Sequence, residues 1–305
     1  MIQRTHCSEA ELEQFYIKFG PSARSAYAYA NMSDTYETAL LERIRLITYK
    51  DLDCLVRSSR WLDLSDQLSH KLLLISPSQM RSGFEASIAT TYLYELLRDA
   101  LSTRHLESAN RLYLLFICNS LTRGSAGYML DDAIRLLYNQ GGFWALVHME
   151  PNPPDPKYTH WKNPPYNAKN VYLRLGYDGQ LITITDNSPS AGAVAEALPF
   201  YQYKSGENLT LKDGYFCPRH HTQATFDAFI YEEASKMATL IQSTTRKDTP
   251  HSVKEEGFRW LQGLGVKSFR YIAVAPPDLV LDLPFPNDLD VPDKYLLVMH
   301  SILPA

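Results

Sequence analysis

The sequence lacks the features that mark several large classes of protein. Its four cysteines are Cys7, Cys54, Cys118 and Cys217, and no two of them form a CxxC pair. Cysteines this far apart predict a reduced intracellular protein rather than a disulfide framework. The N-terminus has no apolar signal-peptide core, and no stretch approaches the roughly 18 apolar residues of a membrane span. We therefore expect a soluble intracellular protein without a membrane partner.

Excess charge and the common catalytic motifs are missing as well. The chain holds 30 basic and 34 acidic residues, a net charge of −4, so binding to nucleic acid would need a local basic surface. The segment GLGVKS (263–268) is not a phosphate-binding P-loop, because Val266 stands where that loop needs glycine. No Gly-x-Ser-x-Gly elbow is present, which disfavours covalent acyl chemistry.

The segment CPRHH (217–221) offers a cysteine and two histidines as metal ligands. A structural zinc site needs four ligands, usually as two spaced pairs, and the sequence shows no second pair. We expect instead a loop that contacts phosphate through Arg219, His220 or His221.

The hydrophobic fraction, 45%, lies in the globular range, and its pattern changes along the chain. Residues 1–65 predict a helical region, because apolar residues recur at helical spacing from residue 9 onward. Residues 66–305 mix helical and β-like patterns and predict an α/β (α+β) domain. Six prolines between 150 and 166 predict a loop insertion, since proline donates no amide to a ladder.

Within the second region, helices are expected at 84–101, 107–121, 125–140 and 249–265, the last with a capping box made by Ser252 and Glu255. Strands are expected at 71–76, 143–149, 171–175, 181–185, 200–203, 215–217, 226–231, 237–243, 269–276 and 295–302.

The segment FDAFIYEEASKMATLIQSTTRK (226–247) carries the pattern of a metal site. Asp227 opens one β-like run, and Gln242 and Thr244 end the next, on a shared face because strand side chains alternate. Oxygen ligands of this kind suit Mg²⁺, and an upstream helical acid, Asp131 or Asp132, would complete the set. A hairpin that packs its apolar side into a core shows the same pattern, so both interpretations stay open.

The order of segments favours the metal site. SAGYMLDDAIRLLYNQGGFWAL, GYFCPRHHTQATFDAFIYE, ATLIQSTTRKDTPHSVKEEGFRWLQGL and YIAVAP follow one another. This order resembles the C-terminal nuclease-like domain of the Crinkler and retrotransposon hot spot proteins, which is similar to the PD-(D/E)xK restriction-endonuclease superfamily. The residues that match its motifs are Ala126, Gly127, Asp131, Asp227, Gln242, Thr244, His251 and Gly257.

The resemblance implies a restriction-endonuclease-like mixed sheet flanked by helices, preceded by a lid-like helical region. It implies hydrolysis of DNA with Mg²⁺ or Mn²⁺ as cofactor, and a nuclear, effector-like role. Asp131, Asp227 and Gln242 would hold the metal, and Thr244 would position water. His251 or Lys254 would face the phosphate, and the DNA backbone would lie along Arg219, His220, Arg246, Lys247 and Arg259.

Two departures keep a second function open. Thr244 stands in place of the lysine of the motif, and Gln242 offers a neutral oxygen where a carboxylate is usual. Hard cations favour anionic oxygens, so the metal site is weakened. The domain is therefore either an active endonuclease or a catalytically inactive module that binds nucleic acid or a partner ATPase. A purely structural hairpin remains a third alternative.

Overall fold

The computed structural model describes thirteen stretches of the chain and forms two compact units, 1–129 and 130–300, which divide inside helix α8 (Arg123–Gln140). The expected boundary between 65 and 66 lies outside the described residues. None of the helices described combines the length and apolar character that crossing a bilayer requires. The described residues are 7–46, 69–77, 84–102, 110, 113–114, 116–117, 123–152, 157–165, 167–187, 194–204, 207–219, 225–245 and 253–300.

The first unit begins with helices whose starts are capped as their sequences predict. Ser8 accepts the amide of Glu11 and the Glu11 carboxylate accepts the amide of Ser8, so α1 starts with a capping box. Ser22 caps α2 through the amide of Ser25. The elements of this unit are α1 (Glu9–Phe19), α2 (Ala23–Tyr29), η1 (Ala30–Met32), α3 (Ser33–Leu46), α5 (Ser69–Leu72), β1 (Leu73–Pro77), β2 (Phe84–Ile88) and α6 (Thr91–Ser102).

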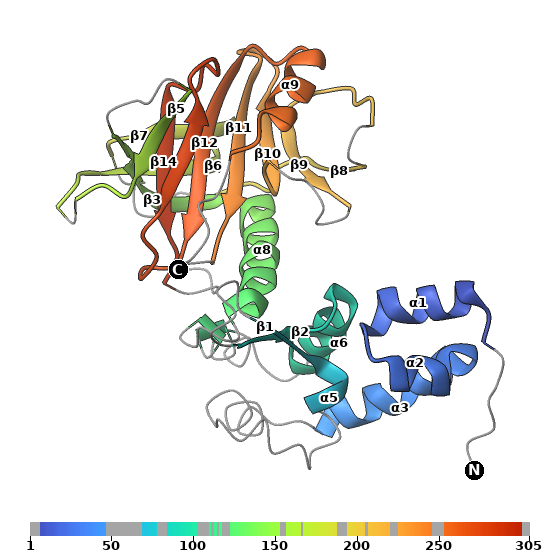
Figure 1. Ribbon diagram of the computed structural model, residues 1–305. Helices are drawn as coiled ribbons and strands as arrows, with labels where there is room; N and C mark the ends of the chain where they lie inside the picture. The colour runs from blue at the N-terminus through green and yellow to red at the C-terminus, as the bar shows by residue number, and fades with distance from the viewer. Residues whose placement is uncertain are drawn as a thin grey trace. The chain divides into compact units, whose positions relative to one another are not determined.

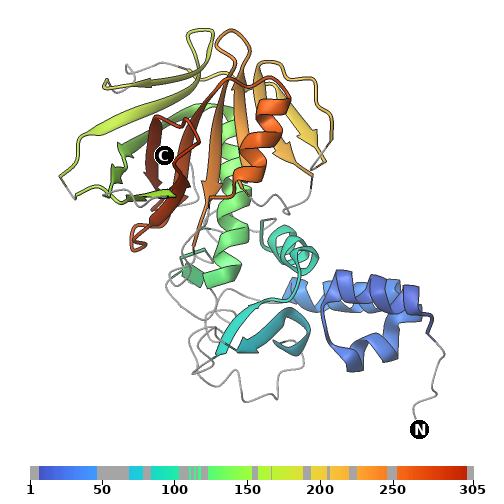
Figure 2. The ribbon, with the colours of Figure 1, turned by 45° about the horizontal axis from the view of Figure 1, so that its top comes forward.

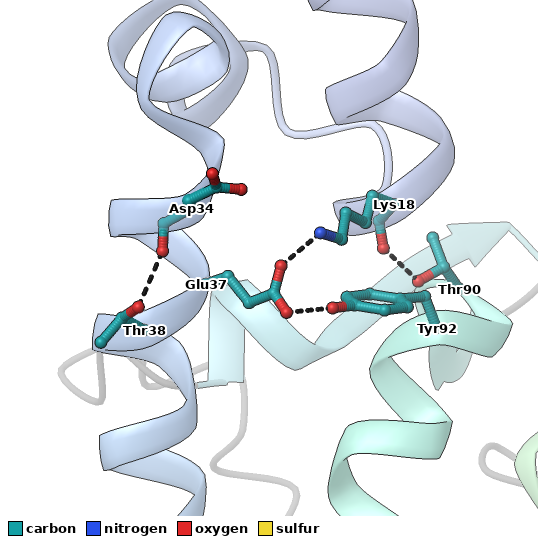
Figure 3. A network of polar contacts seen from close by, with 6 residues as sticks. All are labelled: Lys18, Asp34, Glu37, Thr38, Thr90 and Tyr92. Carbon is teal, nitrogen blue, oxygen red and sulfur yellow. Dashed lines mark hydrogen bonds and ion pairs between the residues drawn. The ribbon is translucent and has the colours of Figure 1, made fainter.

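A polar network joins α1, α3 and the start of α6 (Figure 3). Lys18 forms an ion pair with Glu37, and the Tyr92 hydroxyl donates to the same carboxylate. The Thr90 hydroxyl donates to the carbonyl of Lys18 at 2.8 Å, which satisfies an acceptor at the end of α1. The carboxylate of Glu37 therefore links α1, α3 and α6.

The helix expected at 84–101 is corrected in its first five residues. These residues form β2, which pairs with β1 in antiparallel register from Leu73↔Ile88 to Pro77↔Phe84. The helix itself starts at Thr91, after Thr90 accepts the amide of Leu93 with its hydroxyl. Pairing with the preceding strand outweighs the local helical pattern.

The second unit contains a mixed sheet of nine described strands in the order β7-β6-β3-β14-β12-β11-β10-β9-β8 (Figure 1). The parallel pairs are β11 with β12, β12 with β14 and β8 with β9, and the other neighbours are antiparallel. The expected mixed α/β class is confirmed. The strands are β3 (Gly142–His148), β6 (Asn170–Tyr177), β7 (Gln180–Thr185), β8 (Phe200–Tyr203), β9 (Gly214–Pro218), β10 (Ala228–Glu232), β11 (Met237–Ser243), β12 (Ser268–Ala275) and β14 (Asp293–Val298).

The helices α8 and α9 (Glu255–Gly263) contact opposite faces of this sheet. Phe258 of α9 packs edge-on against Phe269 of β12, with ring centroids 5.1 Å apart. Tyr138 of α8 packs edge-on against Tyr215 of β9 at 6.5 Å. Figure 2 shows α9, in orange, lying against the strands. Because strand side chains alternate, each strand presents one set of residues to α9 and the other to α8.

The prediction of a loop insertion at 150–166 is corrected, because part of this segment forms paired strands. Strand β4 (Glu150–Pro151) and β5 (Tyr158–Lys162) join β13 (Asp282–Pro286) in a second, three-stranded sheet. The five residues of β5 contain no proline, so their amides are free to pair along β13. The capping box expected for α9 is not described at Ser252, and the N-cap position is Lys254, without a side-chain cap.

Gly257 allows α9 to approach the chain closely just before β10. Its amide donates to the Thr225 hydroxyl at 3.1 Å. A Cβ atom added at this glycine would lie 2.6 Å from the Thr225 Cβ and 2.8 Å from a ring atom of Phe226. A glycine at this position therefore lets the first turn of α9 contact the residues that precede Asp227.

Lys294 is a charged side chain enclosed between the two sheets of this unit. Only 6% of the residue is exposed. Its ammonium lies 4.1 Å from the ring centroid of Trp161 and 4.8 Å from that of Phe285, and it donates to the carbonyl of Val291. Burial lowers the pKa of Lys294 to about 8. The aromatic rings offset part of the cost of enclosing the charge.

Replacing Lys294 with methionine should remove one pH-dependent part of the stability. The unfolded lysine titrates near a pKa of about 10.4, so the unfolded chain binds more protons between about 8 and that value. The free energy of unfolding of the wild type should therefore rise by about 3 kcal/mol across this window. Urea unfolding at about pH 7.5 and about pH 10 measures the rise.

The control is Lys169→Met, because the Lys169 side chain is 75% exposed. It should keep the rise of the wild type, whereas Lys294→Met should lose it. An equal rise in both variants would contradict the burial of a charged Lys294.

Candidate functional site

Two acidic side chains distant in the sequence meet at one serine. The hydroxyl oxygen of Ser243 lies 2.8 Å from Asp227 Oδ2 and also forms a hydrogen bond with Asp131 Oδ1. The backbone amide of Ser243 donates to Asp227 Oδ2 at 2.6 Å. The two acids expected from the sequence therefore come together around a residue that was not expected.

Three elements of the second unit position these groups. Asp131 lies on α8, Ser243 is the last residue of β11, and Asp227 immediately precedes β10. The amide of Asp227 donates to the carbonyl of Ile241 at 2.8 Å, which continues the β10–β11 ladder by one bond. The backbone of Asp227 is thus fixed by the ladder, and its carboxylate turns along the sheet to the end of β11.

The three groups can satisfy each other only if one acid carries a proton. Ser243 has a single hydroxyl proton and can donate to one carboxylate, so the other acid must donate to the serine oxygen. Burial raises the pKa of Asp131 well above its ordinary value, and the charge of Asp227 raises it further. Burial also raises the pKa of Asp227, although its hydrogen bonds from Ser243 oppose this. One proton is therefore held by the pair of acids as a unit.

The acids lie deep in the unit, yet residues Asp131 and Asp227 are both partly exposed. Arg135 is also partly exposed, and its positive charge lowers the pKa of both acids, against the larger effect of burial. The interior position of the site strengthens each electrostatic interaction.

Gln242 and Thr244, the other expected ligands, are placed differently. Gln242 precedes Ser243 on the strand, and its side-chain oxygen accepts a hydrogen bond of 2.8 Å from the Tyr271 hydroxyl. Thr244 is 7% exposed, and its amide donates to the carbonyl of Val274 at 2.9 Å. Strand alternation places 242 and 244 on one side and Ser243 on the other, so the contact with Asp131 falls to Ser243.

The remaining expected residues do not join the acids in the described structure. Arg219 and Lys254 are exposed. Arg259 is exposed on α9 and forms ion pairs with Glu255 and with Asp288, the latter at 2.6 Å. The expected contacts that lie outside the described residues are His220, Arg246, Lys247 and His251.

Ser243 and Arg135 are the residues that the sequence analysis missed. Ser243 lies between Gln242 and Thr244, the two residues of the Gln-x-Thr motif. The prediction took the face of those two residues as the ligand face, and Ser243 points to the opposite face. Arg135 follows Asp131 by four residues, which on a helix places both side chains on one face. That spacing is visible in the sequence and could have identified Arg135.

The donors suit a hard divalent cation that keeps much of its own hydration. Across the described ranges, no three His, Cys, Asp or Glu side chains gather as a group that could hold a metal ion. Mg²⁺, however, is commonly bound by one or two carboxylates together with water and substrate phosphate. The charge of Asp227 raises the pKa of Asp131, and a cation bound between the two acids would relieve this repulsion.

Asp131→Asn should stabilise the unit at neutral pH in metal-free buffer. The pKa of Asp131 is raised by folding, so the folded state binds more protons above the unfolded pKa of about 3.9. The free energy of unfolding therefore falls as pH rises through the folded pKa, and asparagine avoids that loss. We expect a gain of about 1–3 kcal/mol at about pH 7.5 and no gain near pH 4.

Urea unfolding with a chelator present measures this gain. Asp178→Asn is the matched control, since the Asp178 side chain is 74% exposed and pairs with Arg174. If Asp131→Asn is less stable than the wild type at neutral pH, the carboxyl group of Asp131 stabilises the fold there and the prediction is wrong.

Comparisons with protein-family models, with curated proteins and with solved structures returned no match. The resemblance to the Crinkler and retrotransposon hot spot proteins stays a prediction from the sequence.

Proposed function

We propose that residues 130–300 form a divalent-metal-dependent phosphodiesterase that acts on DNA. The observation that carries the proposal is the meeting of Asp131 and Asp227 at Ser243, with both acids partly exposed. Buried like charges cost stability, and acids with raised pKa values in this setting are typical of functional sites. A bound cation would offset the repulsion between the two acids, which would explain why both are present.

The order of elements also supports the proposal. The helix with Asp131, the strand that follows Asp227, the strand that ends at Ser243 and the last helix occur as α8, β10, β11 and α9, before β12. This is the order that the family resemblance implies. Asp131 lies on α8, and Asp227 immediately precedes β10.

In this proposal Asp131 and Asp227 hold Mg²⁺ or Mn²⁺. When bound, the metal polarises the phosphate and lowers the pKa of the attacking water. Ser243 keeps the Asp227 carboxylate in one orientation through its amide and hydroxyl. Hydrolysis forms a bond from the oxygen of water to phosphorus and breaks one ester P–O bond, so no further reactant is needed.

A second candidate is a catalytically inactive module that binds DNA or a partner ATPase. Two observations favour the inactive module: Gln242 accepts a hydrogen bond from Tyr271, and Thr244 is buried. Neither residue offers a charge to the acids. A site with two acids and without the lysine of the motif could bind a metal and a phosphate without accelerating cleavage.

Metal-dependent cleavage separates the two candidates. Supercoiled DNA incubated with the protein and Mg²⁺ or Mn²⁺ should be nicked, and nicking should be lost with a chelator. Asp227→Asn should reduce the rate by at least about 100-fold, because a neutral amide binds hard cations poorly. Asp178→Asn, an exposed acid of the same unit, should leave the rate unchanged.

Binding of the same DNA decides the remaining outcomes. Salt-sensitive binding without cleavage by the wild type supports the inactive module. A protein that neither binds nor cleaves DNA contradicts both candidates for this substrate.

A further inference from the structure

The proposed site has two acids but lacks the cation that its motif would supply. Thr244 takes the place of that lysine and is buried. Arg259 is occupied by two carboxylates, and Arg219 and Lys254 are exposed on other segments. Among the described residues, Arg135 of α8 is a cation whose charge acts on both acids. This inference rests on the proposed function.

Arg135 occupies the sheet-facing side of α8. Asp131 contacts Ser243 at the end of β11, and Tyr138 packs against Tyr215 of β9. Residues 131, 135 and 138 are spaced by four and three, so they lie along one helical face. Arg135 is one turn from each contact and therefore lies over the sheet between β11 and β9, where β10 runs.

The sheet leaves room for the guanidinium there. Ala228 of β10 is paired with Ile241 of β11, whose neighbour two residues on is Ser243. Strand alternation therefore places Ala228 on the side of α8, and its methyl group is small. Arg135 is partly exposed as a residue, although its Nε atom is buried, and its charge acts on both acids.

A buried hydrogen-bond donor lies on the same side of the sheet as this arginine. Tyr215 packs against Tyr138 of α8, and the positive charge of Arg135 lowers the pKa of Tyr215, although burial raises that pKa more. Tyr215 is fully buried, and its hydroxyl has no hydrogen-bond partner among the described residues. Buried polar groups are ordinarily satisfied, so an unsatisfied hydroxyl near a cation favours an anion or ordered water beside it.

We propose that Arg135 binds a non-bridging oxygen of the phosphodiester at the Asp131–Asp227 pair and takes the place of the absent lysine. The planar guanidinium presents paired donors that match phosphate oxygens, and a lysine presents only a point charge. The alternative role is that of a counter-ion, which would only balance the acids. The two roles differ once a metal is bound, because the metal then balances the acids by itself.

Two titrations test the assignment. The first measures Mn²⁺ binding without DNA by calorimetry. The second measures binding of a fluorescent DNA duplex of about 12 base pairs by anisotropy, with saturating Ca²⁺ in place of Mg²⁺ to keep the DNA intact. Arg135→Gln should weaken DNA binding about tenfold or more, the usual effect of losing a charge-assisted contact. Its Mn²⁺ affinity should stay equal or rise a few-fold, because a neighbouring positive charge is gone.

The matched control is Arg174→Gln, which removes an arginine paired with Asp178 elsewhere in the unit. It should change neither titration. DNA binding by Arg135→Gln equal to that of the wild type would overturn the assignment and leave Arg135 a counter-ion. If Arg135→Gln does not fold, Arg135→Lys decides. A loss of about threefold or more in DNA affinity at unchanged Mn²⁺ affinity supports the paired-donor contact, and equal affinity overturns it.

Failure of the proposed function gives a different result. A wild type that does not bind Mn²⁺, with Asp227→Asn indistinguishable from it, overturns the metal site and with it the role of Arg135. A wild type that binds Mn²⁺ but not DNA overturns the phosphate contact alone.

Discussion

The second unit depends on the hydroxyl group of Ser243, which joins Asp227 to Asp131, an acid that precedes the serine by 112 residues. Ser243 links the helix α8 to the end of β11, and through its amide it also fixes the carboxylate at the start of β10. Ionisation of both acids would place two negative charges in the interior at this junction. The arrangement therefore requires a shared proton or a cation, and the protonation of the site and the stability of the fold are linked.

The two faces of the sheet differ in what they contribute. On the side of α9 the contacts are mostly aromatic, as in the stacked rings of Phe216 and Phe229, whose centroids are 4.8 Å apart. On the side of α8 charged and hydroxyl groups meet, including Asp131, Ser243 and Arg135. A well-packed core on one face can support an arrangement of like charges on the other, since only the sum of the terms must favour folding.

Much of the fold could be predicted from local patterns, but the choice of face could not. Strand β11 has the bounds expected, Met237–Ser243, because its apolar run is long and ends at polar residues. Ala238 and Leu240 lie on one face and Ile241 on the other, so both faces carry apolar residues and the pattern does not say whether 242 or 243 faces the helix. The pairing of β5 with β13 joins segments more than a hundred residues apart, and its register comes from tertiary contacts that local periodicity does not contain.

The close approach of Gly257 to Thr225 has an evolutionary consequence. The first turn of α9 and the residues before Asp227 share one small space, which is already filled by the Thr225 side chain. Any side chain at 257 needs that space, so descendants of this chain can enlarge position 257 only if position 225 shrinks to glycine and the Phe226 ring shifts, or if the backbone moves. In an alignment of such descendants, 225 and 257 would covary, although neither residue belongs to the acidic pair.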